Sequence, residues 1–206
     1  MRPHLRVEGL GFGHDDLPLF EGLTLDLGPG LSVVIGGDGR GKTTLIALLA
    51  GALMPQSGEC TACGVRLSQD PMGYRAQVLR AGDHADDLAS LAAGEWLAGV
   101  ARAHVAFDVA LRDTLIEGLQ LAPHLHKTGE MLSTGTRRKV QITAALAASA
   151  PITLIDDPFA ALDFGSTRCL TEVLRSLGER RDRVLLLACH APVAGLVDPP
   201  VLDLGD

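Results

Sequence analysis

One short segment constrains the fold of this chain more than any other. Residues 31–35 form a run typical of a buried β-strand, and apolar residues recur with helical spacing over residues 45–49. The loop between these two segments reads Gly36, Gly37, Asp38, Gly39, Arg40, Gly41, Lys42, Thr43 and Thr44. A strand, a glycine-rich loop and a helix in this order predict an α/β fold, with the loop at the carboxyl edge of a mainly parallel sheet.

The spacing of glycine and lysine in this loop predicts that it binds phosphate. Residues 36–43 read Gly-x4-Gly-Lys-Thr, which is the pattern of a phosphate-binding loop. Glycines allow successive backbone N–H groups to wrap a polyphosphate, and the start of the following helix adds partial positive charge. We expect Lys42 to reach the β- and γ-phosphates of a nucleotide and the Thr43 hydroxyl to bind Mg²⁺.

The composition excludes several other classes of protein. The chain has 206 residues, 47% hydrophobic and 21% charged, which suits one folded core and does not suit a disordered chain. The formal net charge of −7 argues against proteins that coat nucleic acids or bind membrane surfaces through clustered Lys and Arg. No run of about 18 apolar residues is present, and the N-terminus lacks an apolar signal region. We therefore expect a cytoplasmic location.

Four further runs read as strands. Residues 5–7 and 23–27 are expected in an N-terminal antiparallel β part. Residues 152–155 and 184–188 are apolar runs typical of a parallel sheet that is buried on both faces.

The middle of the chain has a helical pattern. Residues from about 79 to 131 are rich in Ala and Leu and predict a helical insert, in which we expect Ser90 and Asp108 to cap helices. A further helix is expected from about 134 to 148. We therefore predict a single domain over residues 1–206 with a helical subdomain inserted in it.

Two of the four cysteines are close in the sequence. Cys60 and Cys63 are three residues apart and are either a redox pair or ordinary residues of a strand and turn. Because Gly58 and Gly64 flank them, we expect a short strand and turn in a reducing compartment.

Two adjacent carboxylates follow the run at 152–155. Asp156 ends this strand and is expected at the carboxyl edge of the sheet, beside the phosphate-binding loop. There it would hold Mg²⁺ through a water molecule, while Asp157 would act as general base for an attacking water. An Asp-Asp-Pro sequence also suits a plain turn, and the phosphate-binding loop upstream favours the chemical role.

With these motifs in order, the chain resembles the ATP-binding cassette (ABC) family, and the resemblance covers essentially its whole length. It assigns the family signature to Leu132, Ser133, Thr134, Gly135 and Thr136. It implies that Phe12 stacks on adenine and that Gln77 senses Mg²⁺ and the attacking water. It also implies that Asp163 belongs to the family's D-loop and that His190 holds the γ-phosphate.

The resemblance implies a P-loop NTPase fold and a mechanism. Two cassettes would pack head-to-tail, with each ATP between the phosphate-binding loop of one and Ser133 and Gly135 of the other. Gln77 would couple the site to integral membrane subunits on the cytoplasmic face of the inner membrane, and ATP-driven dimerisation would energise transport. In its compact length the chain is similar to haem-exporter ATP-binding subunits.

The chain departs from the family pattern at three positions. Asp157 stands where the family has Glu, so its carboxylate is one methylene shorter, and Thr134 and Thr136 replace Gly and Gln in the signature. Three functions stay open: a working transport ATPase, a hydrolysis-impaired cassette that acts as a switch or as the silent half of a heterodimer, and a soluble ABC protein that acts on nucleic acid. The acidic balance disfavours the third function.

Overall fold

The computed structural model describes residues 3–14, 17–82, 85–196 and 199–205, and it contains two sheets. An antiparallel sheet contains β1 (Leu5–His14), β2 (Leu17–Leu27), β4 (Ser57–Ala62) and β5 (Val65–Arg66), in the order β2-β1-β4-β5. A parallel sheet contains β3 (Gly30–Ile35), β6 (Val78–Arg80), β7 (Ile152–Asp156), β8 (Val184–Cys189) and β9 (Val201–Asp203), in the order β6-β7-β8-β3-β9. The mainly parallel sheet with an N-terminal antiparallel part is confirmed.

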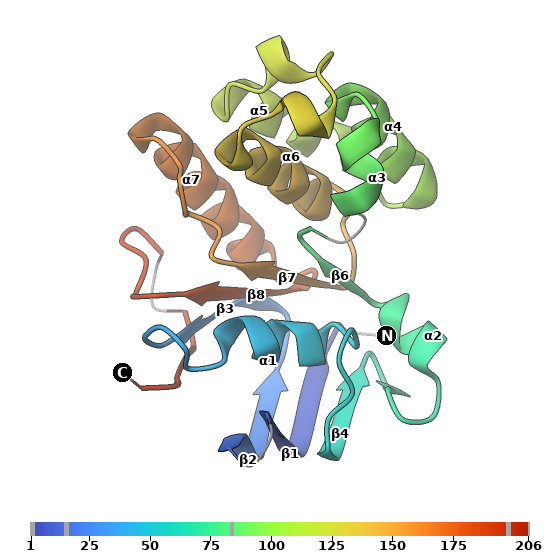
Figure 1. The fold of residues 1–206 in the computed structure, drawn as a ribbon, viewed down its shortest axis with the longest axis vertical. Helices are drawn as coiled ribbons and strands as arrows, with labels where there is room; N and C mark the ends of the chain where they lie inside the picture. Colours follow the sequence, from blue (N-terminus) through green and yellow to red (C-terminus); the bar gives the residue numbers. More distant parts are fainter. Residues whose placement is uncertain (1–2, 15–16, 83–84, 197–198, 206) are drawn as a thin grey trace.

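Helices cover the parallel sheet on both faces (Figure 1). One face carries α1 (Lys42–Leu49) and the antiparallel sheet, and α2 (Pro71–Arg75) leads into the edge strand β6. The opposite face carries α6 (Thr134–Ala147) and α7 (Phe164–Arg180). Above them lie α3 (Ala85–Ser90), α4 (Ala93–Ala103), α5 (Val109–Gly118) and the 3-10 turns η1 (Ala122–His124) and η2 (Gly129–Met131).

Two hydrophobic cores follow from the alternation of side chains along the strands. Val34, Leu154 and Leu186 point into the core that is shared with α1 and the antiparallel sheet. Their neighbours Ile155 and Leu187 point into the second core, which α4 to α7 complete. Because both faces of the sheet are covered, its strands read as apolar runs in the sequence.

The helical part differs from its expected bounds in two ways. Residues Val78–Arg80 are strand β6, paired with β7, so the helices start at α3 rather than near residue 79. Ser90 ends α3, and the next helix, α4, has Ala92 at its N-cap. The expected cap at Asp108 is present, because its side chain accepts a hydrogen bond of 2.9 Å from the backbone N–H of Leu111.

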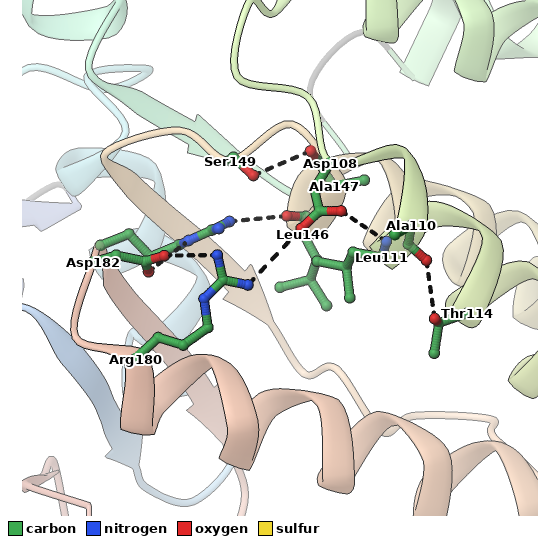
Figure 2. A network of polar contacts seen from close by, with 10 residues as sticks. Asp108, Ala110, Leu111, Thr114, Leu146, Ala147, Ser149, Arg180 and Asp182 are labelled. Atoms are coloured by element: carbon green, nitrogen blue, oxygen red, sulfur yellow. Dashed lines mark hydrogen bonds and ion pairs between the residues drawn. The ribbon is translucent and has the colours of Figure 1, made fainter.

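A polar network fastens the far ends of the helices to one another (Figure 2). Arg180, in the last turn of α7, lies 3.8 Å from Asp108 and 2.9 Å from Asp182. The Asp108 backbone N–H donates to the carbonyl of Ala147 at the end of α6, at 2.7 Å. The buried Arg183 guanidinium donates to the Leu146 carbonyl at 3.0 Å. Thus α5, α6 and α7 are joined at the end remote from the signature.

All four cysteines are free thiols. Cys60 lies in β4, and Cys63 is the first residue after the end of this strand. Three residues of strand span about 10 Å, which exceeds the Cα separation of about 7 Å that a disulfide allows. The interpretation as ordinary strand and turn residues is therefore confirmed. Among the described helices, none is long and apolar enough to cross a membrane.

Candidate functional site

Three loops meet at the carboxyl edge of the parallel sheet. The register pairs Ile35 with Cys189, and Ala188 with Asp156. The segments that follow β3, β7 and β8 therefore leave the sheet side by side. This brings together the phosphate-binding loop, the Asp156-Asp157 pair and His190, as their positions in the sequence predict.

The phosphate-binding loop depends on two glycines with positive φ. Gly39 has φ 76° and Gly41 has φ 85°, a region that side chains disfavour. At Gly41 a side chain is also excluded by packing, since a Cβ there would lie 2.7 Å from Leu19 Cδ2 and 2.9 Å from Phe20 Cζ. The hairpin of β1 and β2 therefore supports the loop from outside the motif.

The first glycine of the loop is required by packing as well. A Cβ on Gly36 would lie 3.1 Å from Leu204 Cβ and 3.2 Å from the Gly205 carbonyl oxygen. The backbone N–H of Gly37 donates to that same carbonyl at 3.0 Å. Residues that follow β9 thus hold the start of the loop.

Lys42 is folded back onto its own loop. Its ammonium donates to the carbonyls of Gly36 at 2.6 Å and Gly37 at 2.7 Å, and only 8% of the residue is exposed. Among the described residues the partners of this nearly buried ammonium are neutral carbonyls, so a phosphate would give it a charged partner. The lysine is thus positioned at the mouth of the loop.

Thr43 and Asp156 are joined across the edge of the sheet. The Thr43 hydroxyl donates to Asp156 Oδ2 at 2.7 Å, and Arg138 Nη2 donates to the Asp156 carbonyl at 3.1 Å. A hydroxyl and a carboxylate that converge in this way suit Mg²⁺, which usually keeps several waters and binds substrate phosphates as well. No group of three or more His, Cys, Asp or Glu that could hold a metal occurs within the described ranges.

His190 lies between two carboxylates. Its Nε2 is 3.8 Å from Asp157 Oδ2, and its Nδ1 is 3.4 Å from Asp38 Oδ1 in the phosphate-binding loop. Asp157 has φ 46°, a conformation that Asp tolerates better than Glu. The neighbouring Cys189 is buried, and burial together with Asp157 and Asp156 raises the pKa of its thiol to about 12, so it stays protonated.

The residues predicted to form the signature lie at the start of α6. Ser133 is the N-cap, and its Oγ accepts from the Thr136 N–H at 3.1 Å and lies 2.8 Å from the Thr136 hydroxyl. Thr134 is exposed, and Leu132 is buried in the second core, where it anchors the segment rather than facing a ligand. A Cβ on Gly135 would lie 3.1 Å from the Ala161 carbonyl oxygen, so the signature packs directly against the D-loop.

Asp163 ends the D-loop and begins α7. Its carboxylate caps the helix by accepting from the Ser166 N–H at 2.9 Å and the Ser166 hydroxyl at 2.7 Å. It also pairs with Lys139 of α6 at 2.8 Å. The hydrogen bond from Lys139, followed by those from Ser166, holds the pKa of the Asp163 carboxyl well below its usual range.

Phe12 lies in the antiparallel sheet, near the loop but not in it. It pairs with Phe20 across β1 and β2, and Phe20 is one of the two side chains that would meet a Cβ on Gly41. Phe12 is partly buried against the first core. Its stacking on adenine stays a prediction.

Gln77 was placed at the nucleotide by resemblance, and the structure contradicts this. Gln77 precedes β6, and its carbonyl accepts from the N–H of Ile152, the first residue of β7, at 3.0 Å. The parallel pairing puts Gln77 at the amino edge of the sheet, about 13 Å of strand away from Asp156. The segment that reaches the nucleotide edge from β6 starts at Ala81 and Gly82 instead.

Sequence reasoning missed four residues that hold the site together. Leu19 and Phe20 support Gly41, Arg138 binds the Asp156 carbonyl, and Lys139 binds Asp163. Arg138 and Lys139 belong to a run of three basic residues, 137–139, that follows the signature, but nothing local in the sequence names their partners.

Comparison with known proteins gives a consistent family. The model of the family described as ABC transporter matches residues 20–160. The chain is 34% identical over 194 residues to the taurine import ATP-binding protein TauB of Pseudomonas syringae, covering 90% of this chain and 72% of that protein. It is 32% identical over 164 residues to the cytochrome c biogenesis ATP-binding export protein CcmA of Rhodospirillum rubrum, covering 76% and 67%.

Solved structures agree with these relatives. An ATP-binding subunit of an ABC transporter superimposes with a TM-score of 0.76 at 26% identity, over 90% of this chain and 79% of that one. The dimeric bacterial ABC transporter cassette MJ0796 superimposes with a TM-score of 0.78 at 20% identity, over 98% and 94%, and so shares the fold. Because the family model matches residues 20–160 and a relative that is 34% identical covers 90% of the chain, this chain belongs to the ABC transporter family as an ATP-binding cassette.

Proposed function

We propose that this chain binds ATP with Mg²⁺ and hydrolyses it as the ATP-binding subunit of a transporter. The observation that supports this most is the 2.7 Å hydrogen bond between Thr43 and Asp156, next to a loop lysine whose ammonium donates to two neutral carbonyls. Thr43 and Asp156 would hold Mg²⁺, which when bound offsets the negative charge of the phosphates.

The chain's own residues would have different roles in hydrolysis. Lys42 leaves the Gly36 and Gly37 carbonyls and binds the β- and γ-phosphates. Asp157 takes a proton from the attacking water, and His190, 3.8 Å from that carboxylate, holds the γ-phosphate. Gln77 has no part in these steps, because it lies at the opposite edge of the sheet.

A second cassette completes the site in this proposal. The start of α6 offers the N–H groups of Thr134 and Gly135 beyond the Ser133 cap, and such a helix start favours an anion. In the cassette itself Gly135, in the first turn of this helix, packs against Ala161 of the D-loop. The phosphate that it binds would therefore belong to a partner's ATP, in a homodimer or a heterodimer.

Membrane subunits are the proposed partners in transport. The relatives include both import and export ATP-binding proteins, so they do not select a direction. A cavity of about 450 Å³ between β6, α4 and α6 offers a contact surface, with Trp96 and Val100 in its lining and the half-exposed Leu91 at its side. Co-purification from detergent with Leu91→Glu and the wild type side by side would test this surface, since the added charge should reduce recovery of the membrane subunit.

The alternative is a cassette that binds ATP but hydrolyses it poorly. The short Asp157 side chain and the exposed Thr134 at the start of α6 favour this second function. Such a chain would act as a switch or as the silent half of a heterodimer.

Phosphate release separates the two functions. The purified chain is assayed with MgATP over a range of protein concentrations, beside Lys42→Ala and Asp157→Asn. A working ATPase gives turnover that rises with cassette concentration and exceeds both variants. Turnover no greater than that of the variants, with retained ATP binding, would contradict hydrolysis and favour the switch.

A further inference from the structure

Lys139 lies where three helices meet. It is in α6, about one turn after the signature, and its ammonium pairs with Asp163 Oδ2 at 2.8 Å at the start of α7. The same ammonium donates to the carbonyl of Leu119, the C-cap of α5, at 3.3 Å. A cation at the end of one helix and beside the capping carboxylate of another has two favourable partners.

The Lys139 end of this contact is shielded, whereas the Asp163 end is open to solvent. The exposed fractions of the two side chains are 13% for Lys139 and 53% for Asp163, against 47% and 64% for the Arg175–Glu179 pair on the outer part of α7. A shielded ammonium that lost its carboxylate would have one neutral carbonyl left as partner, and an uncompensated charge of this kind is unfavourable. Lys139 therefore constrains where the D-loop lies relative to α6.

A second contact binds the same two segments one turn earlier. Gly135 in the signature is so close to Ala161 of the D-loop that a Cβ would lie 3.1 Å from its carbonyl oxygen. Ala161 has φ 59°, a conformation that must be held by its surroundings. Phe159 and Leu162, on either side, pack into the second core.

The D-loop continues directly into the carboxylate proposed as general base. The Ala160 N–H donates to the Asp157 carbonyl at 3.2 Å, and the Asp157 N–H donates to Ala188 on β8 at 2.8 Å. A displacement of residues 160–163 would thus act on the backbone of Asp157. The signature, the D-loop and Asp157 form one chain of contacts, with Lys139 as its ionic link.

We propose that Lys139 is a positioning residue that holds the signature and the D-loop as one unit, so that a partner's ATP bound at Ser133 and Gly135 aligns Asp157 in the cassette's own site. This inference rests on the proposed function, because it needs two cassettes that share their nucleotides. It names the residue of this chain that would hold the signature and the D-loop together when the two sites of the dimer act on each other. Coupling of this kind appears as a Hill coefficient above one for ATP.

The test removes the ion pair between Lys139 and Asp163 while it retains the helical structure of α6 and α7. Lys139→Met retains the length of the side chain without its charge, and Asp163→Asn retains a good N-cap for α7 without a carboxylate. Steady-state hydrolysis is measured against ATP concentration for the full chain. We expect the Hill coefficient to fall from about 2 towards about 1 in both variants and to fall no further in the double variant.

Two controls distinguish positioning from general damage. Lys139→Arg restores an ion pair and should restore the Hill coefficient, whereas Arg175→Met removes an ion pair from the outer part of α7 and should leave it unchanged. At protein concentrations too low for dimerisation, the affinity of Lys139→Met for ATP should stay within about twofold of that of the wild type. A merely structural role would lower the amount of active protein without changing the Hill coefficient.

The outcomes separate this inference from the proposed function. A wild type that neither dimerises with ATP nor hydrolyses it would overturn both. A cooperative wild type whose Hill coefficient is kept in Lys139→Met and in Asp163→Asn would overturn the coupling alone. If Lys139→Met fails to fold, the Asp163→Asn variant decides the question.

Discussion

The two nucleotide-facing regions of this cassette differ in how closely they keep the family pattern. In the region around the phosphate-binding loop, Lys42, Thr43 and Asp156 all have the expected residue type and lie at one edge of the sheet. In the region at the start of α6, Thr134 and Thr136 replace the expected residues, and Thr136 bonds to the Ser133 hydroxyl.

The difference separates ATP binding from closure of a dimer. The loop region positions its own groups through contacts within one chain, so its affinity for ATP should not depend on a partner. The signature region has no nucleotide of its own and acts only on a second cassette's ATP in the proposed function. Changes there, and at Asp157, should therefore alter turnover and association while ATP binding by one cassette is retained.

The largest effect is expected in the loop region, from Lys42→Ala. Loss of the ammonium removes a charge-assisted contact to the phosphates and should lower turnover by at least about 100-fold. Equilibrium binding of ATP measures the affinity of Lys42→Ala, and phosphate release measures its turnover. Lys127→Ala serves as a control, since Lys127 pairs with His124 in the helical part. Unchanged ATP affinity in Lys42→Ala would show that the loop does not bind the nucleotide through this lysine.

A smaller effect is expected from Asp157→Glu. The longer side chain brings the carboxylate about one bond length closer to the water and should raise turnover by about 10-fold. The positive φ at residue 157 opposes this change and should cost about 1 kcal/mol of unfolding free energy. Phosphate release measures the change in turnover, and thermal unfolding measures the change in stability. Slower turnover in the Glu variant would mean that this site is built around Asp.

In the signature region, Thr134→Gly should strengthen association. It removes the side chain that would crowd a partner's phosphate, and we expect ATP-dependent dimerisation to improve by about threefold, which corresponds to about 0.7 kcal/mol of association free energy. Sedimentation of an Asp157→Asn background with and without ATP measures this. Thr114→Gly, a like change in α5, should leave association unaltered. Equal dimerisation with Thr or Gly at 134 would show that the signature tolerates the side chain.

The sequence predicted the features that depend on neighbouring residues. The strand, loop and helix around Lys42, the Asp108 cap and the buried strands at 152–155 and 184–188 all follow local patterns. It failed where the answer depends on distant residues. The strand at 78–80 has only three residues, which carry too little pattern to be recognised in the sequence. The prediction that Gln77 lies at the nucleotide edge of the sheet was therefore wrong. The partners of Gly41 and Lys139 are likewise set only by the packing of separate segments.

The smallest effect is therefore expected from Gln77→Ala. Because Gln77 lies beside Ile152 at the amino edge of the sheet, its replacement should leave ATP turnover within about twofold of the wild type. Asp156→Asn, at the carboxyl edge of the adjacent strand, sets the opposite limit, with an expected loss of about 100-fold. Phosphate release at saturating MgATP compares the two variants directly. A loss in Gln77→Ala that approaches that of Asp156→Asn would mean that β6 changes its pairing when nucleotide binds.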